Sequence, residues 1–144
     1  SNRTRISQMS KITNPINISG KKLEKAVEEF FILKDYNFDR PKGKGVKIDF
    51  ILETTEGRKY IECKNQNTDG SVDEKIPFTV WKYRKKYKIN HIIIVHGEKY
   101  IKKSVKDCIN KLMPDMKVEY YNFYSFCRVM QGKKVMGDLE LCMN

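Results

Sequence analysis

A run of six residues, His91 to His96, constrains the fold of this chain more than any other segment. Its centre, Ile92 to Val95, is a stretch of four consecutive β-branched apolar residues, and polar residues bound the run on both sides. A short continuous apolar run of this kind is typical of a strand that is buried on both faces. We therefore expect an α/β core in which helices flank a sheet.

The segment before this sheet reads as an amphipathic helix that begins at Ser19 and Gly20. Its apolar residues recur on one stripe, at Leu23, Ala26, Val27, Phe30 and Phe31. Glu24 falls at the edge of that stripe, about 100° from Leu23, and from there a carboxylate can reach toward the sheet. Another helix follows residue 70, and we expect it to begin near Pro77, because a proline inside a helix leads to a kink.

The remaining segments complete one domain. Residues 100–113 carry apolar side chains at helical spacing, residues 117–121 read as a last strand, and residues 122–131 read as a short aromatic-rich helix. The chain has 144 residues, enough for one compact core. We therefore expect residues 19–144 to form a single domain and residues 1–18 to form a tail that is partly disordered.

Alternating residues in the middle of the chain predict a β-hairpin. The expected inward-facing residues of the first strand are Val46, Ile48, Phe50 and Leu52. A turn-like stretch at residues 54–57 follows, and residues 58–64 read as the return strand. If residues 54–57 form a four-residue loop, Glu53 faces Arg58, and this pairing sets the register of the whole hairpin.

That register brings two carboxylates and one lysine onto one face. Asp49 falls opposite Glu62, with Cβ atoms roughly 5 Å apart, and Lys64 projects from the same side two residues later. Carboxylate oxygens bind Mg²⁺, which polarises a phosphate and lowers the pKa of a bound water. A lysine can position that water or neutralise charge on the phosphate. The alternative is an ordinary solvated strand face, on which charged residues are common.

The order of these groups resembles the PD-(D/E)XK nuclease superfamily, which includes many restriction endonucleases and archaeal Holliday-junction resolvases. A helix carries Glu24, a strand carries Asp49, and the next strand carries Glu62-Cys63-Lys64, so the resemblance covers roughly Gly20 to Val95. It implies a restriction-endonuclease-like core, with a mixed central sheet of about five strands flanked by helices. The residue before Asp49 is Ile48 rather than the proline of the family name.

The resemblance also implies a role for each residue of the motif. Asp49 and Glu62 would be the metal ligands, joined by the main-chain carbonyl of Cys63, and Lys64 would be the catalytic lysine. The implied cofactor is Mg²⁺, for which Mn²⁺ would substitute. Glu24 would assist the metal site through water, and the polar residue just after the motif would join the catalytic group. That residue is Gln66.

The resulting hypothesis is a divalent-metal-dependent endonuclease that hydrolyses DNA, either restriction-type or structure-selective. The alternatives are a Holliday-junction resolvase, a ribonuclease, and a non-catalytic nucleic-acid-binding accessory domain. Clustered acids that face a polyanion would repel it unless a cation lay between them, which disfavours the accessory domain. One domain has one active site whereas a duplex has two strands, so we expect a homodimer.

The charge of the chain favours a polyanionic partner, DNA in the first place and RNA as the alternative. The formal net charge is +11, and cations are concentrated in residues 41–47 and 81–88. The expected nucleic-acid-binding residues are Lys42, Lys44, Lys47, Lys75, Lys82, Arg84, Lys85 and Lys86. The segment 81–88 also contains aromatic residues that could stack on bases. Its alternative interpretation is a helix in which Trp81 and Tyr87 belong to the core.

The four cysteines have no close pairing such as Cys-x-x-Cys, which argues against a zinc site. Their scatter predicts free thiols in a reducing compartment, and core packing is the expected role of Cys108 and Cys127. The sequence shows no signal peptide and no apolar run long enough to span a membrane. We therefore expect an intracellular protein, in the cytoplasm or nucleoid, with no membrane partner.

Overall fold

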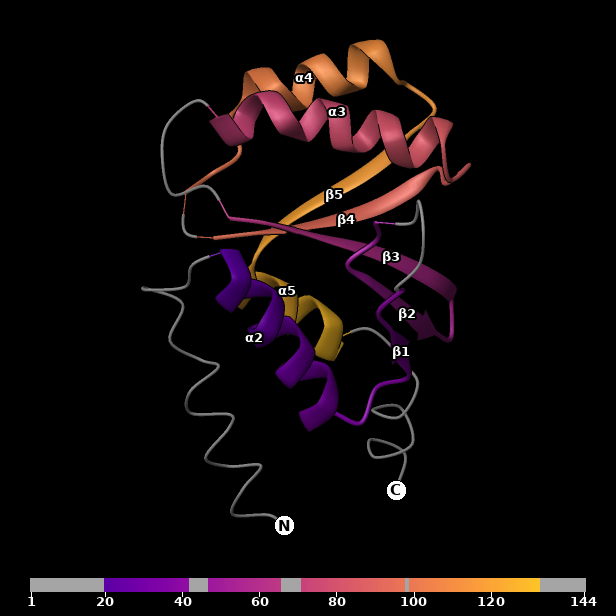
Figure 1. Ribbon diagram of the computed structural model, residues 1–144, viewed down its shortest axis with the longest axis vertical. Helices are drawn as coiled ribbons and strands as arrows, with labels where there is room; N and C mark the ends of the chain where they lie inside the picture. The colour runs from indigo at the N-terminus through magenta and orange to yellow at the C-terminus, as the bar shows by residue number, and fades with distance from the viewer. Residues whose placement is uncertain (1–19, 42–46, 66–70, 98, 133–144) are drawn as a thin grey trace.

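A five-stranded mixed sheet lies between two pairs of helices (Figure 1). The computed structural model describes residues 20–41, 47–65, 71–97 and 99–132. The helices are α2 (Gly20–Leu33), α3 (Ser71–Lys85), α4 (Lys103–Leu112) and α5 (Phe123–Gly132). The strands are β1 (Phe38–Asp39), β2 (Phe50–Thr54), β3 (Gly57–Lys64), β4 (His91–His96) and β5 (Lys117–Asn122). This arrangement confirms the expected α/β class.

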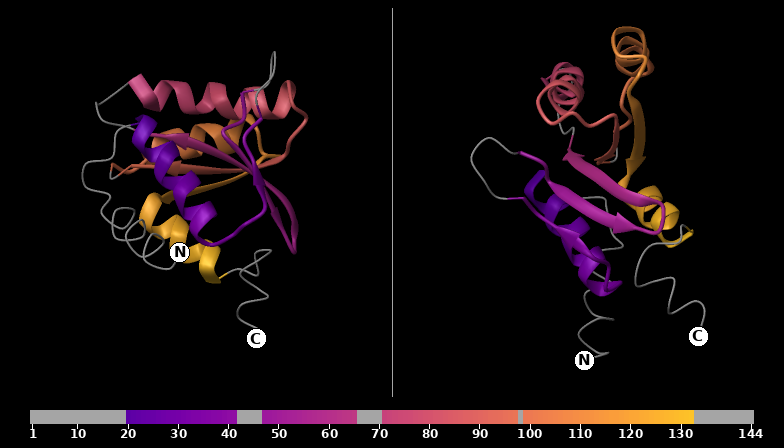
Figure 2. Two further views of the ribbon diagram at one scale, coloured as in Figure 1. Left: turned by 60° about the horizontal axis from the view of Figure 1, so that its bottom comes forward. Right: turned by 90° about the vertical axis from the view of Figure 1, so that its right-hand side faces the viewer.

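The strand order in the sheet is the order in the chain, β1-β2-β3-β4-β5. The first three strands pair antiparallel, whereas β3, β4 and β5 pair parallel. Each parallel step is a crossover through a helix, α3 after β3 and α4 after β4, and both helices lie on the same face (Figures 1 and 2). Helices α2 and α5 cover the opposite face.

Strand β4 contributes to two separate cores, as its continuous apolar run predicted. Ile93 and Val95 join the cluster under α2 and α5, whereas Ile92 and Ile94 join the cluster under α3 and α4. All four side chains are buried. The α2 side is rich in aromatic rings, and Phe31 and Phe50 meet edge to face with their centroids 5.4 Å apart. Burial on both faces fixes the position of the strands that carry the polar groups of the site.

The hairpin of β2 and β3 has the predicted register but a tighter turn. Glu53 pairs with Arg58, as expected, yet Thr54 already pairs with Gly57. The loop therefore contains only residues 55–56 rather than four. Gly57 has a φ of +111°, a conformation that favours glycine, which explains why the chain can reverse so sharply there.

The predicted alternation fails at the open end of this hairpin. Strand β2 begins only at Phe50, which pairs with Ile61. Phe50 belongs to the core under α2 and α5, but Ile48 packs in the core under α3 and α4. Placing Ile48 on the same face as Phe50 was wrong, because the backbone leaves the ladder at Asp49 and the two-residue period no longer applies.

Two further expectations about the helices were wrong. Helix α3 does not begin near Pro77; it begins at Ser71 and contains Pro77 in its interior. Ile76 and Val80, on either side of the proline, are fully buried, and this packing holds the helix together despite the missing N–H. Cys108 is exposed on α4 rather than packed in the core. Cys127 is half-buried, and burial raises the pKa of its thiol to about 12.

Candidate active site

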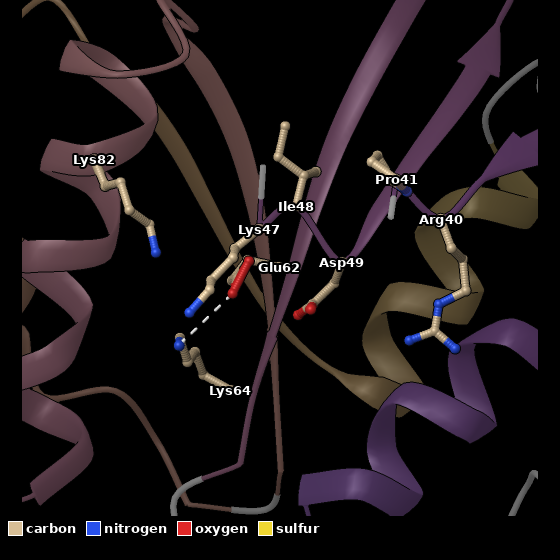
Figure 3. A pocket seen from close by; sticks show the side chains of 8 residues that line it. All are labelled: Arg40, Pro41, Lys47, Ile48, Asp49, Glu62, Lys64 and Lys82. Carbon is tan, nitrogen blue, oxygen red and sulfur yellow. Dashed lines mark ion pairs between the residues drawn. The ribbon is translucent and has the colours of Figure 1, made fainter. Parts of the chain in front are cut away.

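Three of the predicted catalytic residues, Asp49, Glu62 and Lys64, line one cavity of about 460 Å³ at the open end of the β2–β3 hairpin. Its lining residues are Arg40, Pro41, Lys47, Ile48, Asp49, Glu62, Lys64 and Lys82. Figure 3 shows Lys64 and Lys82 on one side of the Glu62 carboxylate and Asp49 on the other. The cavity thus combines a pair of carboxylates with several cations.

Asp49 occupies the point where the ladder between β2 and β3 stops. Its Oδ2 atom accepts a hydrogen bond of 2.8 Å from the backbone N–H of Cys63 on β3. The carboxylate of Asp49 thus accepts the hydrogen bond of a β3 N–H at the point where backbone pairing with β2 ends. This bond fixes the side chain beside the position from which Glu62 extends, so the departure from regular strand geometry orients Asp49.

Glu62 projects from β3 toward α3 and is held there by Tyr83. The hydroxyl of Tyr83 donates a hydrogen bond of 2.5 Å to Oε2 of Glu62, and both groups are buried. The other oxygen, Oε1, lies 3.6 Å from the ammonium nitrogen of Lys64. Glu62 and Lys64 therefore share a face, as predicted. A tyrosine from α3, the helix that packs over this face, sets the orientation of the carboxylate.

Glu24 reaches the same region from the other face of the sheet. It accepts a hydrogen bond of 3.0 Å from Arg40, whose guanidinium also pairs with Glu28 and lies over the Phe50 ring. Glu24 also lies close enough to Asp49 for the two carboxyl groups to interact electrostatically. Arg40 thus holds the helix carboxylate in place beside the site, within reach of Asp49.

The three carboxyl groups have raised pKa values. Burial is the main cause at Glu24, Asp49 and Glu62 alike. The negative charge of Glu62 raises the pKa of Asp49 further, and that of Asp49 does the same for Glu24. The Cys63 N–H lowers the pKa of Asp49, but not enough to reverse the effect of burial. Partly buried carboxylates that repel one another favour a cation between them.

The donor set of the site fits a hard divalent cation. Asp49 and Glu62 offer carboxylate oxygens, the ligands that Mg²⁺ prefers, and the main-chain carbonyl of Cys63 is the predicted third ligand. In the part of the chain that the structure describes, no three His, Cys, Asp or Glu side chains form a ready metal cage. Two carboxylates agree with Mg²⁺ chemistry, because this ion commonly keeps several waters and takes few protein ligands.

The predicted nucleic-acid-binding cations fall into three groups. Lys47 and Lys82 line the cavity, whereas Lys75, Lys85 and Lys86 are exposed on or just beyond α3. Arg84 instead pairs with Asp115, at 2.8 Å, and does not reach the site. Three other predicted site residues lie outside the described part of the chain: Lys42, Lys44 and Gln66.

Two residues of the site escaped the sequence prediction. Tyr83 lies on the buried stripe of α3 with Ile76 and Val80, and a tyrosine on such a stripe needs a polar partner for its hydroxyl. This requirement for a polar partner was the sequence signal that could have indicated a role for Tyr83. Arg40 carried no signal, because its contact with Glu24 depends on how β1 follows α2. The alternative that placed Trp81 and Tyr87 in the core is wrong for Trp81, whose ring is 48% exposed, whereas Tyr87 is partly buried against the core under α3 and α4.

Comparison with known protein families identifies the class of protein that this sheet and its carboxylates indicate. A sequence model described as a PD-(D/E)XK nuclease superfamily domain matches residues 42–121, which is more than half of the chain. The chain belongs to this superfamily of nucleases. No curated protein sequence matches the chain.

One similar solved structure is named "Crystal Structure of Protein of Unknown Function AF1548". It shares 16% identity with this chain at a TM-score of 0.48, and the match covers 69% of this chain and 56% of that one. This chain therefore spans a little over half the length of that protein.

None of the helices in the described part of the chain has the length and apolar character of a membrane-spanning segment.

Proposed function

We propose that this chain is a divalent-metal-dependent endonuclease that hydrolyses phosphodiester bonds in DNA. The observation that carries the proposal is the convergence of Asp49, Glu62 and Lys64 on one cavity, which several further cations also line. Membership in a nuclease superfamily supports the reaction class, and the net charge of +11 supports a polyanionic substrate.

Each residue has a role that follows from its position. Asp49 and Glu62 would hold the cation, which supplies Lewis-acid polarisation of the phosphate and a more acidic bound water. Lys64 is placed to orient the attacking water or to stabilise negative charge on the phosphate oxygens. Tyr83 keeps Glu62 in the required orientation, and Glu24 assists from the opposite face, through water.

The remaining cations of the cavity would bind the nucleic-acid backbone. Lys47 and Lys82 line the same cavity as the carboxylates, so a phosphate there would meet positive charge on one side and the metal site on the other. Arg40 lines the cavity too, but its guanidinium holds Glu24 and Glu28. Its proposed role is therefore to position the helix carboxylate rather than to bind substrate.

The substrate of the enzyme is proposed to be DNA, with restriction-type or structure-selective cleavage, including cleavage of four-way junctions. A duplex has two strands and each chain has one site, so the working form is proposed to be a homodimer. RNA cleavage and metal-independent binding are the competing functions, and both are separated from the proposal by the same assay.

The test is a cleavage assay on a supercoiled plasmid, a four-way DNA junction and a single-stranded RNA. Each substrate is incubated with Mg²⁺, Mn²⁺ or EDTA, using the wild-type chain and Lys64→Ala. We expect metal-dependent cleavage of DNA that the variant lacks. Sedimentation analysis of the wild-type chain tests the dimer in the same buffer.

Each other outcome points to a different function. Cleavage of RNA alone would overturn the DNA assignment while leaving the site intact. Cleavage by Lys64→Ala at the wild-type rate would show that the assigned site is wrong. Tight, salt-sensitive binding without cleavage of any substrate would identify a binding domain rather than an enzyme.

A further inference from the structure

Two aromatic rings lie exposed on the outer surface of α3. Phe78 is 61% exposed and Trp81 is 48% exposed, although large apolar side chains are usually buried. Their rings stack on each other, with centroids 5.9 Å apart and planes inclined by 24°. Even with this mutual stacking, much of both rings remains in contact with water, and such an exposed aromatic patch points to a binding partner.

The aromatic pair lies on the same helix face as a row of lysines. A helix turns about 100° per residue, so Lys82 falls only about 40° from Phe78 and one turn away along α3. Lys75 and Lys85 lie on this side as well, and both are exposed. The stretch 75–88 contains no acidic residue. The aromatic pair is therefore embedded in positive charge, which favours a polyanion over an apolar protein surface.

One edge of this face borders the catalytic cavity, because Lys82 belongs to both. Lys82 lines the cavity together with Glu62 (Figure 3). By helix geometry, Phe78 lies one turn before Lys82 on the same side of α3. On the opposite side of α3, Tyr83 bonds Glu62 and anchors the helix to the sheet. A nucleic-acid strand whose phosphate occupies the cavity would therefore meet Lys82, and Phe78 lies one helical turn from that contact.

An aromatic ring can stack on a base only where the face of the base is free. In an intact duplex each base is already covered on both sides, whereas bases in single strands, ends, bulges and branch points can unstack and bind to side chains. Nearly parallel rings offer such a base a continuation of their own stack. The surface of Phe78 and Trp81 is therefore suited to an unpaired base rather than to the outside of a DNA duplex.

We propose that Phe78 and Trp81 bind an unpaired base of the DNA substrate beside the cleavage site, so that the enzyme prefers DNA containing single-stranded segments. This inference rests on the proposed nuclease function, which it narrows from restriction-type or structure-selective cleavage to the second of these. Trp81 is the only tryptophan of the chain, so its fluorescence reports directly on contact with a base.

The experiment measures binding in EDTA, without cleavage. The full chain is titrated with a short oligothymidylate and, separately, with a blunt hairpin duplex of equal phosphate count. We expect the oligothymidylate to quench Trp81 fluorescence. By fluorescence anisotropy, Trp81→Ala should weaken oligothymidylate binding about tenfold, because it removes the ring on which a base would stack. Binding of the blunt duplex should change less than about twofold, because it depends on phosphate contacts.

Two variants serve as matched controls. Trp81→Phe keeps an aromatic face and should retain most of the affinity for the single strand. Tyr124→Ala removes a ring that is 52% exposed on α5, on the other side of the sheet, and should change neither affinity. A general folding defect in Trp81→Ala would lower the affinity for both ligands equally and would be visible by circular dichroism. In that case Trp81→Phe and Phe78→Ala are compared instead. The proposal then requires Phe78→Ala to bind the single strand more weakly than Trp81→Phe does, with the duplex affinities unchanged.

The proposal is overturned if the single strand leaves the fluorescence unchanged and Trp81→Ala binds it like the wild type. It is also overturned if Trp81→Ala lowers the sedimentation mass of the free protein, which would show that the rings join two copies of the chain. Because no cleavage is measured, stacking can fail while metal-dependent cleavage persists. Equally, stacking can succeed in a chain that proves unable to cleave.

Discussion

The two ends of the β2–β3 hairpin carry the same kinds of charged residues in opposite environments. At the turn, Glu53 and Arg58 lie on paired positions of a regular ladder, 2.8 Å apart, with side chains that are 37% and 56% exposed. At the open end, Glu62 and Lys64 lie 3.6 Å apart, with side chains that are only 9% and 26% exposed. The turn end is thus a solvated ion pair, and the open end is a partly buried one.

The two ends of the hairpin differ in how many carboxyl groups lie together and in whether a buried side chain holds them. The two charges of the turn-end pair neutralise each other and are exposed to solvent, so this pair does not favour binding of a further ion. The open end adds Asp49 and Glu24, so that three carboxyl groups with raised pKa values lie near one another. It also receives Tyr83 from another layer of the fold. The open end is therefore distinguished by clustered, partly buried carboxylates that the fold holds in place.

The largest expected effect is on catalysis. Lys64→Ala should lower the rate of DNA cleavage by about 10²–10³-fold, because it removes the cation that stabilises charge on the phosphate. Arg58→Ala, the matched change at the turn end, should leave the rate within about twofold. Single-turnover cleavage measures both. A comparable loss in Arg58→Ala would mean that the two ends are not distinct in function.

A smaller effect is expected from loss of the hydroxyl that orients Glu62. Tyr83→Phe should reduce cleavage about tenfold and raise the Mg²⁺ concentration needed for half-maximal activity, since groups that hold metal ligands influence affinity on this scale. Tyr120→Phe is the control, because among the described residues its buried hydroxyl has no hydrogen-bond partner. An unchanged Mg²⁺ dependence in Tyr83→Phe would limit the tyrosine to a structural role.

Salt dependence separates the phosphate-binding cations from the solvated ones. The logarithm of the DNA association constant should fall linearly with the logarithm of salt concentration. Lys82→Ala should reduce the magnitude of that slope by about 0.9 if Lys82 contacts one phosphate. Arg58→Ala should leave it unchanged. Equal slopes for the wild type and Lys82→Ala would remove Lys82 from the binding surface.

The smallest expected effect is on stability in the absence of metal. Because burial raises the pKa of Asp49, the free energy of unfolding falls as pH rises from the unfolded-state pKa through the folded-state pKa, and it stays lower at neutral pH. Asp49→Asn keeps an acceptor for Cys63 but removes the charge. It should raise the melting temperature at pH 7 by a few degrees, which corresponds to about 1 kcal/mol.

The pH dependence and a turn-end variant provide the controls for this stability change. The gain from Asp49→Asn should disappear below about pH 4, where the aspartate is itself protonated. Glu53→Gln should show no such gain, because Glu53 lies in a balanced and solvated pair. Scanning calorimetry in EDTA measures both. Destabilisation by Asp49→Asn at neutral pH would contradict the view that the charge is held at the expense of stability.

The sequence predicted those parts of the molecule that depend on local pattern. The burial of β4 on both faces follows from its continuous apolar run, and the register of the hairpin follows from pairing Glu53 with Arg58. The grouping of Asp49, Glu62 and Lys64 then depends on that register. Period and pairing are properties of neighbouring residues, so a single sequence contains them.

The errors arose where packing between layers overrides local pattern. Ile48 changes sides because the ladder ends at Asp49, and Pro77 remains inside α3 because buried neighbours stabilise the helix around it. Tyr83 and Arg40 reach the site from elements that are distant in the sequence. Their contacts are set by the assembled fold, which neither propensity nor spacing describes.

The most direct test of the proposed metal site is to locate a metal ion in crystals grown with Mn²⁺. Anomalous scattering should place the ion at the open end of the hairpin, at coordination distance from the carboxylates of Asp49 and Glu62, and Asp49→Asn should abolish the peak. Mn²⁺ bound at Glu53, or no ordered Mn²⁺ between Asp49 and Glu62 in a crystal with that cavity open to solvent, would contradict the central claim that this cluster of partly buried carboxylates is a catalytic metal site.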